Sequence, residues 1–439
     1  MSRDVASRSQ SPAIAPSPDR DPAASDEVRA LGQYAFAELR EAIGGIGAIH
    51  RAISDRSFNA TGALGAPAKL VHDAIAHGVY TAVRAGNSAI GLAGDAFLAR
   101  REATPGEVSA SARGAQVLAV VNGLVGDQLE REGSELSGAM SVRLAGAGVE
   151  PRAAALRRAF PAASPRIVLF LHGLFETEGA WRLGAAERGG TYLDMVRSEL
   201  GATPLQVRFN TGLRISENGR RLSGLLDRLV AEWPCEVEQI ALVGHSMGGL
   251  VARSACHYAA SEDHTWTDRV GHVVSLGTPH YGSPIEGSVH FAAAALDALP
   301  ETRPFARFLR RRSGGIRDLR SGSIVDEDWI ERDPDELRRV VNQEIPLLEG
   351  ATHCFVAATI TESPDHPLGR LLGDALVLSP SASGIDRERR IGFEAENGLH
   401  LGRSHHLALL NHPVVGEQIL NWLRTPPERI PDGISSATA

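Results

Sequence analysis

From about residue 160 onward, short apolar runs alternate with longer amphipathic segments. Five of the short runs are bounded by polar or turn residues and rich in β-branched side chains, at 167–171, 205–209, 239–243, 272–276 and 354–358. Runs of this length are typical of strands buried on both faces of a parallel sheet. Residues 216–233 place leucine and valine at helical spacing and end at Pro234, which cannot continue a helix. The alternation predicts a doubly wound α/β sheet.

Residues 26–150 follow another pattern, in which apolar side chains recur every three or four positions and alanine is frequent. This predicts an all-helical region with amphipathic helices at about 28–43, 67–83 and 88–100. Its many small residues allow close packing against the α/β domain, a second copy or a lipid surface. Residues 1–25 are rich in Ser, Pro and Asp and lack apolar periodicity, so we expect a disordered tail.

The composition of the 439-residue chain limits the classes of protein to which it can belong. Apolar residues make up 43% and charged residues 22%, as in ordinary globular proteins. The net charge of −8 gives no basic surface for a polyanion, so nucleic acid is not an expected partner. Three cysteines, far apart and odd in number, argue against a disulfide framework and clustered metal ligands. No signal peptide or run of about 18 apolar residues is visible, so a cytoplasmic location is expected.

The strongest chemical motif is GHSMGG at 244–249, between the apolar run 240–243 and a helical pattern. A G-x-S-x-G motif between a strand and a helix is typical of a nucleophile elbow, whose strained turn needs small residues. Gly244 and Gly248 supply that room, and the N–H groups of the following helix favour developing negative charge. We therefore expect Ser246 to be an acyl-accepting nucleophile. The alternative is a glycine turn whose serine only caps a helix.

A second motif, His172-Gly173-Leu174, follows the first predicted strand of the sheet. The loop after an early strand contributes one N–H to an oxyanion hole, and the residue after the nucleophile contributes the other. We expect these donors to be the backbone N–H groups of Leu174 and Met247, with His172 shaping the loop. In a water-poor site one such donor is worth about 3–4 kcal/mol.

The elbow also requires a base near the C-terminus, because the triad follows the order Ser, acid, His. Residues 405–413 read HHLALLNHP and precede a terminal amphipathic helix. We favour His406 as the base because it adjoins the apolar run 407–410, which can seat the ring. His405 and His412 are the alternatives.

For the acid we favour Asp374, in the sequence GDALV at 373–377, where glycine and an apolar run suggest a turn at a strand end. It would fix the tautomer of the base and stabilise its imidazolium form. Asp365 and Asp386 are the alternatives for the acid. The alternative role for Asp374 itself is structural, as a carboxylate that stabilises a turn or caps a helix.

These motifs resemble those of α/β-hydrolase lipases, in particular bacterial triacylglycerol lipases and GPI inositol-deacylase-like hydrolases, over residues 166–424. The segment LGTPHYGSP at 276–284 is similar to the Gly-Thr-Pro-His-x-Gly-Ser strand end of that family. The resemblance implies an α/β-hydrolase fold over about 160–430, with a cap or lid insertion at about 283–350. It also implies a triad of Ser246, Asp374 and His406, and an oxyanion hole at Leu174 and Met247.

The expected activity is hydrolysis of small-molecule or lipid carboxylic esters through an acyl-enzyme on Ser246, with no metal or organic cofactor. Two other enzymatic functions use the same triad, namely acyl transfer to an alcohol and depolymerisation of an intracellular polyester. A non-catalytic relative that binds a lipid or partner through the helical region, including contact with a membrane surface, is the hypothesis from another class.

Overall fold

The computed structural model describes residues 112–134, 136–283, 312–330, 342–363, 365–385 and 389–426. The predicted disordered tail and helices before residue 112 lie outside these ranges. The described residues all belong to one compact unit. No helix in these ranges is long and apolar enough to cross a membrane.

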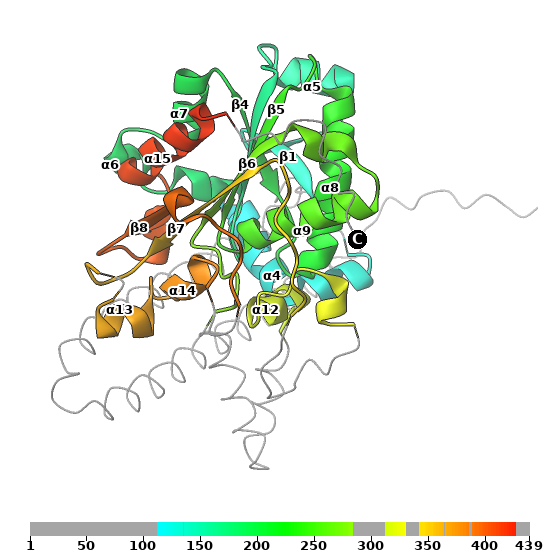
Figure 1. Ribbon diagram of the computed structural model, residues 1–439. Coiled ribbons are helices and arrows are strands. Elements are labelled where there is room, and N and C mark those ends of the chain that lie inside the picture. Colours follow the sequence, from blue (N-terminus) through cyan, green and yellow to red (C-terminus); the bar gives the residue numbers. More distant parts are fainter. Residues whose placement is uncertain are drawn as a thin grey trace, which may run out of the picture. The chain divides into compact units, whose positions relative to one another are not determined.

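The centre of the unit is an eight-stranded sheet in the order β2-β1-β4-β3-β5-β6-β7-β8 (Figure 1). The strands are β1 Ser141–Leu144, β2 Ala147–Val149, β3 Arg166–Leu171, β4 Thr203–Arg208, β5 Gln239–His245, β6 Val270–Leu276, β7 Thr352–Ala358 and β8 Gly398–Leu401. All neighbours from β4 to β8 run parallel, whereas β1 is antiparallel to both β2 and β4. The five predicted strands correspond to β3, β4, β5, β6 and β7, so the predicted mostly parallel α/β fold is confirmed.

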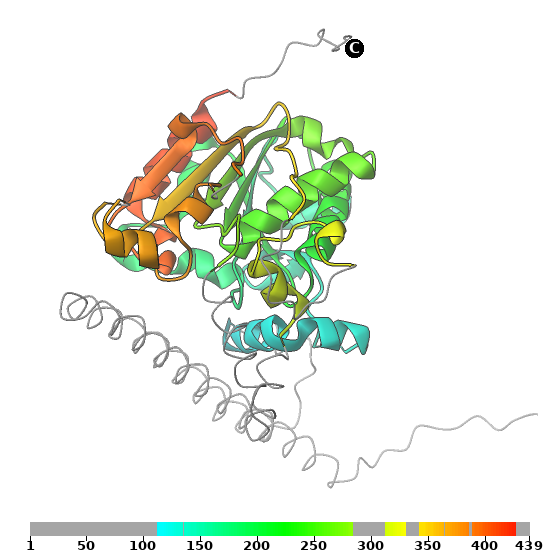
Figure 2. The same ribbon diagram turned by 60° about the horizontal axis from the view of Figure 1, so that its bottom comes forward.

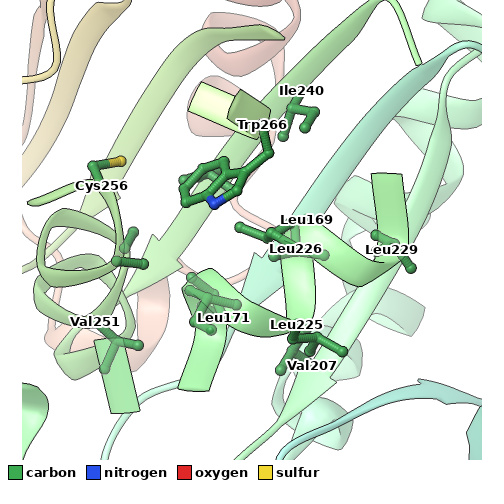
Figure 3. Packing of buried hydrophobic residues seen from close by; sticks show 14 of the residues in the cluster. Leu169, Leu171, Val207, Leu225, Leu226, Leu229, Ile240, Val251, Cys256 and Trp266 are labelled. Atoms are coloured by element: carbon green, nitrogen blue, oxygen red, sulfur yellow. The ribbon is translucent and has the colours of Figure 1, made fainter. Parts of the chain in front are cut away.

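Helices cover both faces of the sheet because successive strand residues point to opposite sides. Leu169, Leu171 and Leu242 pack in one apolar cluster with the helices α5 Ala153–Ala159, α8 Ile215–Glu232 and α9 Met247–Ser261. Figure 3 shows part of this cluster, with Trp266 and the leucines of α8 against the strands.

Phe170 and Val243 point to the other face, in a second cluster with α7 Tyr192–Leu200 and α15 Pro413–Arg424. Helix α8 begins and ends within one residue of the predicted helix at 216–233.

The N-terminal boundary of the domain differs from the prediction. The sequence pattern predicts helix up to about residue 150, and α4 Ala112–Arg131 is helical, but β1 and β2 form a hairpin that adds to the sheet at β4. The physical reason is that each short strand buries little more than one large side chain, Val142 or Val149, so no strand periodicity is visible.

The insertion predicted at about 283–350 lies between β6 and β7. Its described parts contain the short helix α12 Gly314–Leu319 and the 3-10 turn η4 Asp326–Asp328. Residues 284–311 and 331–341 lie outside the described ranges, and so does most of the predicted lid. The remaining short elements are η2 Glu178–Arg182, α6 Ala185–Arg188, η3 Thr265–Arg269, α13 Pro367–Leu372, α14 Ser379–Ala382, η5 Ala395–Asn397 and η6 His406–Leu409.

Candidate active site

Ser246 occupies a sharp turn between β5 and α9. Its backbone has φ 53° and ψ −121°, a conformation that non-glycine residues rarely adopt and that is strained. The Ser246 N–H donates to the carbonyl of Leu276 at the end of β6 (2.8 Å), and the Ser246 carbonyl accepts from Gly249 N–H (3.1 Å). The turn is therefore held on both sides, and the serine lies at the carboxyl edge of the sheet.

The two glycines of the motif sit where the backbone leaves no room for a side chain. A Cβ on Gly244 would lie 2.3 Å from the amide nitrogen of Gly249. A Cβ on Gly248 would lie 2.3 Å from the carbonyl oxygen of Leu171, in β3. Both contacts are to backbone atoms, which cannot swing aside. A larger residue at 248 would therefore force the elbow away from β3, and one at 244 would push against the backbone at the start of α9.

Asp374 and His406 form a buried pair. His406 Nδ1 lies 2.7 Å from Asp374 Oδ2, and the two residues are only 4% and 1% exposed. The other carboxylate oxygen accepts the N–H groups of Leu376 (2.9 Å) and Val377 (2.7 Å). In addition, the His406 N–H donates to the Asp374 carbonyl (3.0 Å). The acid is thus fixed by its own turn, and it orients the imidazole ring through Nδ1.

The electrostatics of this pair favour the imidazolium form of His406. Burial lowers the pKa of the ring, but the charge of Asp374 and the hydrogen bond to it raise the pKa more, so the pKa lies above its ordinary value. A ring held in this way can take a proton at Nε2 while Nδ1 stays bonded to the carboxylate.

The His406 ring lies beside the elbow. Its centroid is 4.8 Å from that of His245, the residue before Ser246. A Cβ on Gly277, which follows Leu276 in the chain, would lie 3.0 Å from His406 Cε1. Because Leu276 also holds the Ser246 N–H, the structure brings the predicted serine, acid and base together at one end of the sheet.

The alternative acids and bases lie elsewhere or make other contacts. His405 is exposed and is the residue before η6, and His412 precedes α15, with its N–H donating to the Tyr192 hydroxyl (2.8 Å). Asp365 is exposed in a turn before α13. Asp386 lies outside the described ranges. Among the described candidates, His406 and Asp374 form the hydrogen-bonded pair.

The loop after β3 lies against the elbow, because a Cβ on Gly173 would lie 3.0 Å from Ser246 Cβ. His172 is buried and shapes this loop: its Nε2 accepts the Phe209 N–H (3.3 Å), its Nδ1 lies 2.9 Å from the Gly173 carbonyl, and its ring stacks on Phe209. Burial lowers the pKa of His172, which suits a neutral structural ring.

The two predicted oxyanion donors belong to segments that meet at Ser246. Leu174 N–H is in the loop after β3, and Met247 N–H is at the first position of α9. Neither N–H donates to another residue in the described part of the chain. The first N–H groups of a helix have no partner within the helix, so Met247 N–H is available to an anion.

Sequence reasoning missed one half-buried carboxylate at this site. Glu176 Oε2 accepts the Gly173 N–H (2.7 Å) and lies 3.1 Å from His245 Nδ1. The only signal in the sequence is a glutamate three positions after the glycine of the HG motif. In the described ranges, no group of three or more His, Cys, Asp or Glu side chains could hold a metal ion.

The mostly parallel sheet, the serine elbow between β5 and α9, and the acid and histidine after β7 together define the α/β-hydrolase fold. The family model described as the PGAP1-like alpha/beta domain matches residues 163–303, which is less than half of the chain. This segment runs from β3 through β6 and includes the HG loop and the elbow. The predicted resemblance to lipase-like and esterase-like α/β hydrolases is confirmed at the level of this domain.

Solved structures with a similar fold include three ester hydrolases. The mature lipase BlEst2 of Bacillus licheniformis is 20% identical over 60% of this chain and 93% of its own, with a TM-score of 0.37. The Staphylococcus hyicus lipase is 15% identical over 59% of this chain and 94% of its own (TM-score 0.35). The Pyrobaculum calidifontis esterase is 12% identical over 60% and 75%, with a TM-score of 0.33. At this distance their names carry no statement about the substrate of this chain. No curated protein matches the chain in sequence.

Proposed function

We propose that the chain is a carboxylic-ester hydrolase that acts through an acyl-enzyme on Ser246. The observation that carries the proposal is the buried pair of Asp374 and His406, with the ring beside a serine in a strained elbow. A hydrogen-bonded acid and histidine at a nucleophile elbow have a specific chemical use, which is to take the proton of the serine hydroxyl.

In the first half of the reaction, His406 Nε2 accepts the Ser246 proton as Oγ attacks the ester carbonyl carbon. The N–H groups of Leu174 and Met247 stabilise the oxyanion of the tetrahedral intermediate. His406 then donates the proton to the leaving alcohol. In the second half, His406 takes a proton from water as the water attacks the acyl-enzyme. His406 then returns the proton to Ser246 Oγ, and the carboxylic acid product leaves. This route has no step that uses a metal or an organic cofactor.

The substrate class that follows is a small-molecule or lipid ester. Transfer of the acyl group to an alcohol differs only in the acceptor of the second half. The proportion of ester formed in the presence of an added alcohol therefore separates a hydrolase from an acyltransferase.

The test is turnover of a p-nitrophenyl ester series, from acetate to palmitate, by wild type and Ser246→Ala, together with labelling by a fluorophosphonate. Ser198→Ala is the matched control, because Ser198 lies exposed on α7 and bonds only within its own helix. We expect wild type and the control to turn over and label, and Ser246→Ala to do neither. Label or turnover that persists in Ser246→Ala would contradict the proposal and favour another nucleophile, whereas a wild type that neither turns over nor labels would favour a non-catalytic role.

A further inference from the structure

Glu176 closes the loop that carries the Leu174 N–H. Its carboxylate accepts the Gly173 N–H (2.7 Å), and its own N–H donates to the Gly173 carbonyl (3.3 Å). The two bonds join the ends of a tight turn, with Leu174 and Phe175 at the tip and Phe175 at φ 62°. The direction of the Leu174 N–H is therefore set by a turn that the Glu176 side chain helps to close.

The same carboxylate also contacts His245, the residue before the nucleophile in the elbow. His245 is fully buried, and its Nδ1 lies 3.1 Å from Glu176 Oε2. The carboxylate and the nucleophile also lie on two sides of one glycine: a Cβ on Gly173 would lie 3.1 Å from Glu176 Oε2 and 3.0 Å from Ser246 Cβ. Glu176 thus touches both segments that supply the oxyanion donors.

Glu176 carries its charge in a nearly closed site. Its side chain is 14% exposed. Burial raises the pKa of Glu176, but His245 and the Gly173 N–H lower this pKa by more than burial raises it, so the ionised carboxylate is the favoured form. The charge also acts on the base, because Glu176 raises the pKa of His406, as Asp374 does.

Within the described ranges, three other titratable or charged groups lie near His406. His245 faces its ring and His405 precedes it in the chain. Arg188 binds the carbonyls of Ala408 and Leu410 in the same segment and lowers the pKa of His405. The two carboxylates thus favour an imidazolium at position 406.

We propose that Glu176 is a positioning residue of the hydrolase site with two roles. Its carboxylate fixes the turn that aims the Leu174 N–H at the oxyanion, and its charge, next to His245, adds to that of Asp374 in stabilising His406 while it holds the serine proton. The inference rests on the proposed function, since both roles serve the acyl-enzyme route.

Two substitutions separate the roles. Glu176→Gln keeps the shape and an oxygen that can accept the Gly173 N–H, but it removes the charge. Glu176→Ala removes both the charge and the acceptor. Glu187→Gln is the matched control, because Glu187 is an exposed glutamate on α6.

For Glu176→Ala we expect kcat for a p-nitrophenyl ester to fall about 100-fold with a smaller change in KM, as for a lost oxyanion donor. For Glu176→Gln we expect kcat at high pH within about threefold of wild type. In this variant the acid limb of kcat/KM should move to lower pH by about 0.5 unit or more, because a neighbouring negative charge is gone. A purely structural role would not move the pH limb of a variant whose thermal melting is unchanged.

The ionisation of His406 is measured separately by NMR, with histidine-labelled protein and assignment by His406→Asn. This titration needs no turnover, so it distinguishes failure of this inference from failure of the proposed function. A lower pKa for His406 in Glu176→Gln, with no change in Glu187→Gln, would support the charge role even if no ester tested is hydrolysed. Equal titrations and equal pH limbs, with kcat of Glu176→Ala within about threefold of wild type, would overturn the inference.

Discussion

Every polar atom of Asp374 has a hydrogen-bonding partner. One oxygen faces His406, the other accepts two N–H groups of its own turn, and its backbone carbonyl accepts the His406 N–H. Donors of this kind stabilise the ionised form of a buried carboxylate and fix its orientation. The acid is therefore placed by residues 376 and 377, which are local in sequence, and the base is placed by the acid.

The first prediction concerns Asp374→Asn. The amide preserves the shape, but its NH2 group can face His406 Nδ1 and leave the ring in the wrong tautomer to accept the serine proton. We expect kcat to fall by about 10³–10⁴, as for the same change in serine proteases, with the fold intact by circular dichroism. The measurement is kcat for a p-nitrophenyl ester together with the rate of fluorophosphonate labelling.

Asp365→Asn is the matched control for this prediction, because Asp365 is exposed in a turn and is the described alternative as the acid. It should retain activity within about twofold of wild type, since surface changes away from the chemistry are nearly neutral. A large loss in Asp365→Asn with little loss in Asp374→Asn would assign the acid role to the other carboxylate.

Helix α4 contacts the loop after β3, which carries Leu174, the residue of the proposed oxyanion donor. The side-chain amide of Gln116 donates to the Phe175 carbonyl (2.7 Å), and a Cβ on Gly123 would lie 2.2 Å from the Phe175 ring. The Gly123 carbonyl in turn accepts the Ser313 hydroxyl (2.6 Å) at the start of α12. Helix α4 thus joins the loop after β3 to the insertion, and both views show α4 beside α12 (Figures 1 and 2).

The second prediction follows from this contact. In Gly123→Val the new side chain occupies the place of the Phe175 ring, so the ring and the turn that carries it must shift. We expect kcat to fall about 10- to 100-fold, because an oxyanion donor that moves by about 1 Å loses much of its effect. The measurement is kcat against the change in melting temperature.

Gly138→Ala is the control, since a Cβ at Gly138 meets no atom within 4 Å. It should leave kcat unchanged. If Gly123→Val instead lowers the melting temperature and leaves kcat of the folded protein intact, α4 supports the fold without positioning the loop.

Elements and site residues could be predicted from the sequence where the signal is local. The core strand β3 shows an unbroken apolar run, and Ser246 lies in a motif that is complete within six residues. Strand β8 was not predicted because its residues are only half-buried and it gains its pairing from β7. The role of Glu176 could not be predicted for a similar reason: its partner His245 is 69 positions away, and only tertiary packing brings the two together.

In the whole α/β unit, the site forms because parallel strands end at the same edge. The HG loop follows β3, the elbow follows β5, Gly277 follows β6, and β7 leads into the segment that carries Asp374. In open α/β sheets this carboxyl edge is where ligands bind. Residues far apart in the chain therefore meet at this edge, in the segments that follow the strands.

The same core makes the stability of the unit depend on pH through buried histidines. Burial lowers the pKa of His272 and of His353 to about 4, and burial lowers that of His280 as well. In the unfolded chain these rings titrate near their usual value of about 6.5. Between these values the unfolded state binds more protons, so the contribution of each ring is present above about pH 6.5 and is lost as the pH falls toward 4.

The third prediction is that the free energy of unfolding falls steeply between pH 6.5 and 4, and less steeply in His353→Gln. Each histidine that must stay neutral contributes a slope of up to about 1.4 kcal/mol per pH unit in this range. His406, whose folded pKa is raised, has the opposite sign: its contribution is present below about pH 6.5 and is lost as the pH rises through the folded value. The measurement is urea unfolding at pH 7, 6, 5 and 4.5.

Glutamine at 353 is uncharged at every pH in this series, so the variant can be less stable than wild type at pH 7 and still lose less on acidification. His366→Gln, at an exposed position, is the control for the loss of a histidine outside the core. Convergence of the wild-type and His353→Gln curves toward pH 4.5 is the expected outcome, because protonation of His353 removes the advantage of the native ring. Parallel curves would mean that His353 is solvated or paired when charged, and that the acid sensitivity arises from other groups in the chain.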